Sequence, residues 1–215
     1  MLARFAMRKK QYAFTLIELM VTLAVVAIVV GVAVPSFNQQ IAQNRSETLS
    51  QDFIFALNFA RTEAVKRSAF VVLCASDDGE DCSTDESAKW RDGFIAAVDY
   101  AASENADAPD LETPVGKQKT ILRVWAGQNA KSVINVNIND STDVNSEIEI
   151  GDPKPFIRFT KIGTLARLTN PPEELVLSLK MAQSKEGDGC IPGSAQRYTI
   201  GIAGVVRLIN ENCWE

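Results

Sequence analysis

The most prominent pattern in the chain is an apolar stretch from Phe14 to Val34, interrupted near its start by Glu18. As a helix with a rise of ~1.5 Å per residue, this stretch would be about 30 Å long, the thickness of a bilayer's hydrocarbon core. Residues 1–13 contain four basic residues and no acidic one. Because positively charged flanks stay in the cytoplasm, the pattern predicts a single span of the inner membrane with a periplasmic domain beyond it.

A secretory signal peptide and a plain membrane anchor have a similar arrangement of basic and apolar segments. The signal peptide is disfavoured because the apolar stretch is long and no A-x-A-like cleavage site closely follows it. A lone charge inside a membrane costs about 2.5 kcal/mol or more. Glu18 therefore indicates a function that a plain anchor does not need.

A second periodic segment follows Pro35, where a helix should bend or loosen because proline has no backbone N–H. Residues 36–68 contain no proline or glycine and carry apolar residues every three or four positions, which predicts an amphipathic helix. We therefore expect two helical segments, 14–35 and 36–68. The core face of the second is predicted to contain Phe37, Ile41, Leu49, Phe53, Leu57, Ala60 and Ala64. Its solvent face is predicted to contain Arg45, Glu47, Asp52, Arg61, Glu63, Lys66 and Arg67.

From residue 69 onward the pattern is that of β-strands. Short runs rich in β-branched and aromatic residues are separated by segments rich in Asp, Ser, Gly and Pro, among them 152–155. A helix followed only by strands indicates an α+β fold with a largely antiparallel β domain over 69–215. The predicted strands are 69–75, 94–100, 120–126, 132–138, 147–150, 156–160 and 175–181, with a hairpin over 197–209 that turns at Ala203-Gly204.

The amino-acid composition excludes several kinds of catalytic and metal site. The chain has no histidine, which excludes Ser-His-Asp and Cys-His catalysis and His-ligated metals. The acidic run 77–81 has oxygen ligands but lacks EF-hand spacing, and no phosphate loop or nucleophile elbow is present. A glycosidase-like pair of carboxylates is the only catalytic chemistry left open. We therefore expect neither an enzyme nor a bound cofactor or metal.

The four cysteines form an even set in a domain that is expected to be exported, where disulfides are the default. Four cysteines allow three pairings. We favour Cys74 with Cys82 and Cys190 with Cys213, because each pair closes a short local loop.

The segment KKQYA/FTLIELMVTLAVVAIVVGVAVPSF closely resembles the class III signal of type IV prepilins and type II secretion pseudopilins. The resemblance implies that a prepilin peptidase removes the leader 1–13 by cutting between Ala13 and Phe14, and that Phe14 is then N-methylated. It assigns an assembly role to Glu18 and a helix-kinking role to Pro35. The family usually has glycine before the cut, so Ala13 implies slower processing.

Downstream motifs resemble the GspH/FimT family of minor pilins. They are F-x3-L-x2-A-R-T-E-A-V-K-R (53–67), DDGEDC and WRDGF (90–94), FIRFTKIGTLA (156–166) and YTIGIAGVVRL (198–208). The resemblance implies a minor pilin that initiates or caps a type IV pilus. Its expected partners are other minor pilins, the major pilin, the prepilin peptidase, the inner membrane and the pilus assembly platform.

Two related functions are alternatives. One is a GspH-type pseudopilin of type II secretion, and the other is a DNA-binding pilin for natural transformation. The DNA-binding members of the family carry a G-R-x-R motif in their last hairpin. The corresponding segment of this chain resembles it but reads Gly204-Val-Val-Arg207. Without residues 1–13, which hold four of the 22 basic residues, the formal charge is 18 minus 27, or −9. An acidic domain repels phosphates, so we do not expect DNA as a partner.

Overall fold

The computed structural model describes residues 14–83, 90–104, 106, 108–127, 131–139, 150–153, 156–166, 174–182, 189–210 and 213. The side chains of 32–36, 137–139, 150–153, 174–175 and 210 lie outside that description. The chain divides into two compact units, Met1–Asn38 and Gln39–Glu215. Each is described below by itself.

One helix, α1 (Leu16–Arg67), contains both of the predicted helical segments. Thr15 caps its start, because its Oγ1 accepts a hydrogen bond of 3.3 Å from the backbone N–H of Glu18. The helix ends in a Schellman motif with Ser68 at φ 52°. There the backbone N–H of Ser68 donates to Val65 and that of Ala69 to Ala64, both at 3.2 Å.

The first sheet has four strands in the order β3-β2-β1-β6, and every neighbouring pair is antiparallel. Its strands are β1 (Phe70–Ala75), β2 (Gly93–Asp99), β3 (Ile121–Ala126) and β6 (Phe156–Phe159), and the short 3-10 helix η1 (Trp90–Asp92) leads into β2. All residues of β2 and β6 are buried, including the charged residues Asp99 and Arg158.

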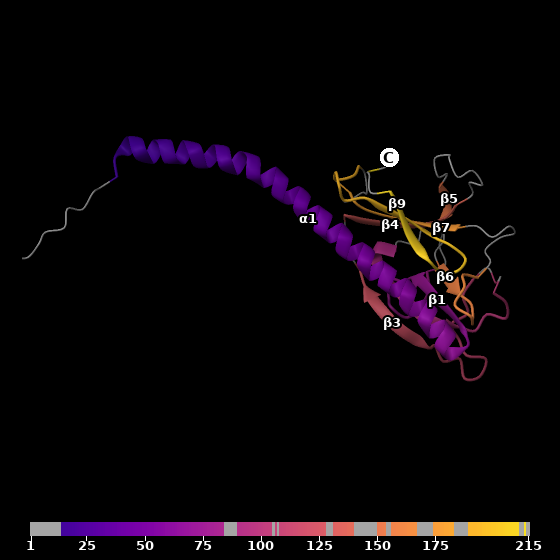
Figure 1. The fold of residues 1–215 in the computed structure, drawn as a ribbon. Coiled ribbons are helices and arrows are strands. Elements are labelled where there is room, and N and C mark those ends of the chain that lie inside the picture. The colour runs from indigo at the N-terminus through magenta and orange to yellow at the C-terminus, as the bar shows by residue number, and fades with distance from the viewer. Residues whose placement is uncertain are drawn as a thin grey trace, which may run out of the picture. The chain divides into compact units, whose positions relative to one another are not determined.

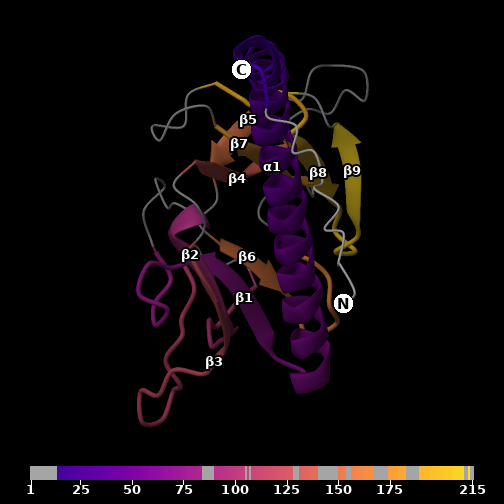
Figure 2. The ribbon, with the colours of Figure 1, turned by 90° about the vertical axis from the view of Figure 1, so that its left-hand side faces the viewer.

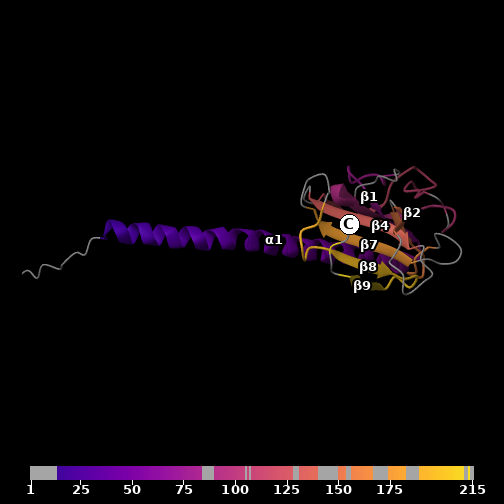
Figure 3. The same ribbon diagram turned by 90° about the horizontal axis from the view of Figure 1, so that it is seen from above.

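The second sheet has five strands in the order β5-β4-β7-β8-β9, again antiparallel throughout. Figure 3 shows β4, β7, β8 and β9 side by side in one layer. The strands are β4 (Ser132–Asn139), β5 (Ile150–Pro153), β7 (Glu174–Met181), β8 (Gln196–Ile200) and β9 (Val206–Asn210). The hairpin predicted over 197–209 is therefore confirmed, and Gly204 in its turn has φ 70°.

The strand predicted over 147–150 overlaps the observed strand only at Ile150, since 147–149 lie outside the described residues. The expectation that residue 152 begins an interruption was wrong, because β5 continues to Pro153. A proline cannot donate to a ladder and is confined to edge strands, and β5 is an edge strand.

The main core lies between α1 and the two sheets, and Figures 1 and 2 show the C-terminal half of α1 running across them. The predicted core face of α1 is buried at Leu49, Phe53, Leu57, Ala60 and Ala64. Ile41 is half-buried. The prediction was wrong for Phe37, which is 67% exposed, and for Glu63, which is buried on the predicted solvent face. The α+β fold with an antiparallel β domain is confirmed.

Candidate assembly surfaces

The first part of α1 exposes apolar side chains along its whole length. Phe14 is 80% exposed and Leu16 is 76% exposed, and large apolar residues remain exposed through Val30. A helix that is apolar on every side requires an apolar environment or partner helices. Among the described residues, no helix combines the length and the hydropathy required to cross a membrane.

Two of the predicted processing and assembly residues are described with their side chains. Phe14 lies just before the Thr15 cap, and Glu18 lies in the first turn of α1, where a carboxylate interacts favourably with the helix dipole. Ala13 lies outside the described residues. The backbone of Pro35 is part of α1, but its side chain lies outside the description, so the predicted bend there stays a prediction.

In the larger unit, the segment 190–194 holds the part of α1 that follows Gln39 by polar contacts. The Gln39 side chain donates to the Pro192 carbonyl at 3.1 Å, and the Ser46 hydroxyl donates to the Ser194 carbonyl. Both Ser46 and Ser194 are buried. Gly193 has φ 77°, and a Cβ there would collide with the Gln43 side chain. We call 190–194 the clamp segment, because it fixes α1 where the helix enters this unit.

The Cys190–Cys213 disulfide ties the clamp segment to the C-terminal end of the chain, with a Cα–Cα distance of 5.8 Å. The clamp is also bonded to β7, since the Ile191 N–H donates to the Met181 carbonyl at 3.0 Å. This is the pairing that loop length favoured. No pattern in the sequence indicates the contact with α1.

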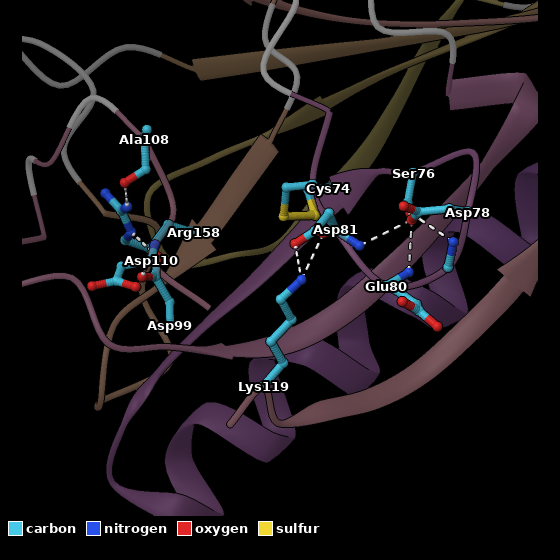
Figure 4. Close-up of a disulfide and its surroundings, with 12 residues drawn as sticks. Cys74, Ser76, Asp78, Glu80, Asp81, Asp99, Ala108, Asp110, Lys119 and Arg158 are labelled. Carbon is cyan, nitrogen blue, oxygen red and sulfur yellow. Dashed lines mark hydrogen bonds and ion pairs between the residues drawn. A yellow bond between two sulfur atoms is a disulfide. The ribbon is translucent and has the colours of Figure 1, made fainter. Parts of the chain in front are cut away.

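The Cys74–Cys82 disulfide closes the acidic loop after β1, with a Cα–Cα distance of 5.5 Å (Figure 4). In this loop the Asp78 carboxylate accepts the backbone N–H groups of Glu80 and Asp81 at 2.8 and 3.0 Å. These bonds lower the pKa of Asp78. The carboxylate therefore shapes its own turn. Among the described residues, no group of three or more His, Cys, Asp or Glu side chains is placed to hold a metal ion.

Sequence reasoning missed a buried ion pair between Asp99 and Arg158, at 2.6 Å (Figure 4). Their side chains are 0% and 1% exposed. Arg158 also donates to the carbonyls of Glu104, Ala106 and Ala108 at 2.7–3.0 Å. The pair thereby fixes the loop between β2 and β3. The available signal was an arginine within the otherwise apolar run FIRF.

The sequence matches known families over most of its length. Residues 8–34 match the family described as "Prokaryotic N-terminal methylation motif", and residues 49–203 match "Type II transport protein GspH". Solved structures with a similar fold include the type IV minor pilin FimU of Pseudomonas aeruginosa, at 18% identity and a TM-score of 0.46. That alignment covers 80% of this chain and 96% of the FimU chain.

The minor pseudopilin EpsH from the type 2 secretion system of Vibrio cholerae is another similar structure. It has 14% identity and a TM-score of 0.41, and the alignment covers 77% of this chain and 96% of that one. No curated protein matches the chain significantly.

A methylation motif at the start of a long helix, followed by an antiparallel β domain, defines the class of pilins and pseudopilins. Within that class, the chain belongs to the GspH family and is a minor pilin or pseudopilin. The motif implies a membrane-anchored pilin with a periplasmic domain. Pilins and pseudopilins are structural proteins that work in complexes with other pilins.

Proposed function

We propose that this chain is a FimU-like minor pilin in the complex that initiates or caps a type IV pilus. The observation that carries the proposal is the methylation motif at residues 8–34 directly before a GspH domain at 49–203. The FimU likeness rests on sequence resemblance, namely the C-terminal cysteine pair Cys190 and Cys213 and the long acidic loops.

The proposal divides the chain by task. Residues 1–13 are a leader removed by the prepilin peptidase, and 14–35 are held in the inner membrane and later packed among the helices of other pilins. Residues 36–68 carry the β domain 69–215, whose surface selects the neighbouring subunits. The exposed apolar side chains from Phe14 to Val30 support the assignment of residues 14–35, because an apolar helix needs a membrane or partner helices around it.

Glu18 has the central role in assembly. Its carboxylate would neutralise the N-terminal ammonium of a neighbouring subunit, since an unpaired charge in an apolar bundle is costly. The other partners follow from the assembly route: minor pilins, the major pilin and the assembly platform.

Processing is tested by mass spectrometry of the assembled protein. We expect a mature chain that begins at N-methylated Phe14. A chain that begins after Pro35 would instead indicate a cleaved signal peptide and would contradict the pilin proposal.

The role of Glu18 is tested by Glu18→Ala, which should leave peptidase cleavage intact and strongly reduce the amount of protein in sheared pili. Thr22→Ala is the matched control, because it also removes a polar group from the apolar part of α1 but no charge. Normal incorporation of Glu18→Ala would refute the charge-pairing role.

A second candidate is a GspH-type pseudopilin of type II secretion, favoured by the description of the matching family. Deletion of the gene distinguishes the two. Loss of surface pili with intact protein secretion supports the pilus, whereas loss of secretion with intact pili supports the secretion machine.

A further inference from the structure

Cations gather at the end of the β domain where α1 finishes, although the mature chain is acidic. We define this basic end by Arg61, Lys66, Arg67, Lys161 and Arg207, which are exposed except for the half-buried Arg61. They come from three segments of the chain, namely the last two turns of α1, the turn after β6 and the β8–β9 hairpin.

Close approaches at two glycines bring these segments together. A Cβ at Gly163 would lie 3.3 Å from Cγ of Arg61, and a Cβ at Gly204 would lie 3.2 Å from Cδ of the same side chain. The two turns are also bonded to each other, since the Leu165 N–H donates to the Ile202 carbonyl at 2.7 Å. Figure 2 shows the end of β6 and the beginning of β9 on the same side of the domain as the C-terminal half of α1. Arg61 therefore lies at the centre of the cluster.

Neutralisation within the basic end is incomplete. Glu63 pairs with Lys66 at 3.2 Å and with Arg67 at 2.6 Å. In the described part of the chain, no acidic side chain forms an ion pair with Arg61, Lys161 or Arg207. The basic end consequently has a net positive charge on a protein whose formal charge is negative.

Exposed apolar side chains lie among these cations. Val65 is 51% exposed, Ile162 78%, Ile202 41% and Val205 61%. Val65 adjoins the turn after β6, since a Cβ at Gly163 would lie only 2.8 Å from its Cγ2. An apolar centre with arginines at its rim is typical of protein–protein interfaces. Interfaces with nucleic acid are more polar and more uniformly positive.

We propose that the basic end binds a different pilin, one whose contact surface has exposed carboxylates around an apolar centre. A second copy of this chain is a poor match. In the described part of its acidic loop, residues 76–83, Asp78 is bonded to backbone N–H groups and Asp81 pairs with Lys119 at 2.5 Å, which leaves Asp77 and Glu80. Complementary charge therefore favours a partner with more free carboxylates. This inference rests on the proposed function as a pilin.

The test is photocrosslinking in cells that assemble the pilus or secretion filament. The full chain carries p-benzoylphenylalanine at Ile162, and a control chain carries it at Val115, which is 87% exposed on the loop before β3. We expect Ile162 to give an adduct with another protein that has an N-terminal methylation motif, identified by mass spectrometry. The Val115 position should not give this adduct.

Charge reversal then tests the chemistry of the contact. Lys161→Glu combined with Arg207→Glu should reduce the adduct about tenfold, because like charges then face each other across the rim. Lys117→Glu, an exposed reversal on the loop that contains Val115, should change the yield less than about twofold, since distant exposed charges are screened.

Four results would overturn the inference: an Ile162 adduct with nucleic acid or lipid, a homodimer, equal adducts from both positions, or no adduct. The control for the proposed function is independent. If the crosslinking chain starts at N-methylated Phe14 and enters the filament, the pilin proposal stands even when the contact surface is refuted.

Discussion

Arg158 shows how much of this domain depends on one buried side chain. Its guanidinium pairs with Asp99, donates to three carbonyls and lies 5.1 Å from the ring of Phe156. The other carboxylate oxygen of Asp99 accepts two backbone N–H groups of the same loop. Because the two charges are paired and their other polar atoms are hydrogen-bonded, the ion pair is tolerated inside an otherwise apolar sheet.

We predict that Arg158→Met destabilises the protein by about 3–5 kcal/mol, because it leaves the Asp99 carboxylate buried without its cation. Chemical denaturation of the full chain in detergent measures this. The control is Arg91→Met, since the half-buried Arg91 pairs at 3.6 Å with the exposed Asp92, and pairs with a solvent-exposed partner contribute about 0–1 kcal/mol. A similar small loss for both variants would contradict the role of Arg158.

Glu63 should make stability depend on pH. Hydrogen bonds from Arg67, opposed by partial desolvation and aided by Lys66, lower the pKa of Glu63 below 4.5. A lowered pKa in the folded state stabilises the protein above the unfolded pKa, and this stabilisation is lost as pH falls through the folded value.

The melting temperature of Glu63→Gln should therefore lie below that of the parent at pH 7, and the gap should shrink as pH falls below about 4.5. Thermal melts between pH 7 and pH 3 measure the gap. Glu47→Gln, which changes an exposed acid on the same helix, should leave the melting temperature at pH 7 close to that of the parent. A gap that is constant with pH would refute the assignment.

At the scale of elements, local patterns predicted the helix and most strands because burial follows them directly. The apolar spacing of Leu49, Phe53 and Leu57 matches the buried face of α1. The pattern failed at Phe37, which belongs to the smaller unit and is 67% exposed. It also ended the strand predicted over 147–150 too early, because only an edge position makes Pro153 acceptable in a strand.

Long-range contacts were beyond such reasoning. A single sequence does not show the division into two sheets. Arg158 stands out in the run FIRF, but the sequence does not show that Asp99, 59 positions away, is its partner. The contact of the clamp segment with α1 is separated even more widely in the sequence, since Ser46 and Ser194 are 148 positions apart. The two disulfides could be predicted because both are local: Cys74 and Cys82 are 8 positions apart, and Cys190 and Cys213 are 23 positions apart.

We predict that the Cys190–Cys213 disulfide slows local opening of residues 39–50 of α1. In Cys190→Ser/Cys213→Ser, backbone amides of residues 39–50 should exchange with deuterium about tenfold faster, while those of 56–67 change little. The reason is that the clamp segment holds Gln39 and Ser46. Hydrogen exchange of the full chain in detergent measures the effect.

The matched control is Cys74→Ser/Cys82→Ser, which removes the other disulfide from the acidic loop after β1. It should leave exchange in 39–50 unchanged. Equal effects of the two double variants would mean that the disulfides act on global stability alone, and the clamp would then have no local function.

At the scale of the whole molecule, charge is segregated. The acidic residues Asp77, Asp78, Glu80 and Asp81 follow β1, whereas the basic end lies where α1 finishes and β1 begins. β1 has six residues, which separates these ends by about 20 Å. The formal charge of −9 that remains without residues 1–13 therefore does not describe the local charge at either end, and a local positive charge attracts carboxylates as well as phosphates.

For this reason we predict weak binding of the full chain to duplex DNA, with a Kd of roughly 10⁻⁴ M or more at physiological salt, as for non-specific contacts. In the final hairpin only Arg207 is fully exposed, since Arg197 is half-buried and Val205 occupies the position of the first arginine in G-R-x-R. Titration of labelled duplex at two salt concentrations measures binding, because phosphate contacts weaken steeply as salt rises. Micromolar binding that Arg207→Ala abolishes would contradict this and identify a DNA-uptake pilin. Val205→Arg provides the converse experiment: it replaces an exposed apolar residue of the final hairpin with an arginine, which completes the G-R-x-R motif with Arg207. If DNA binding arises only in that variant, the exposed valine is what directs this surface toward protein partners.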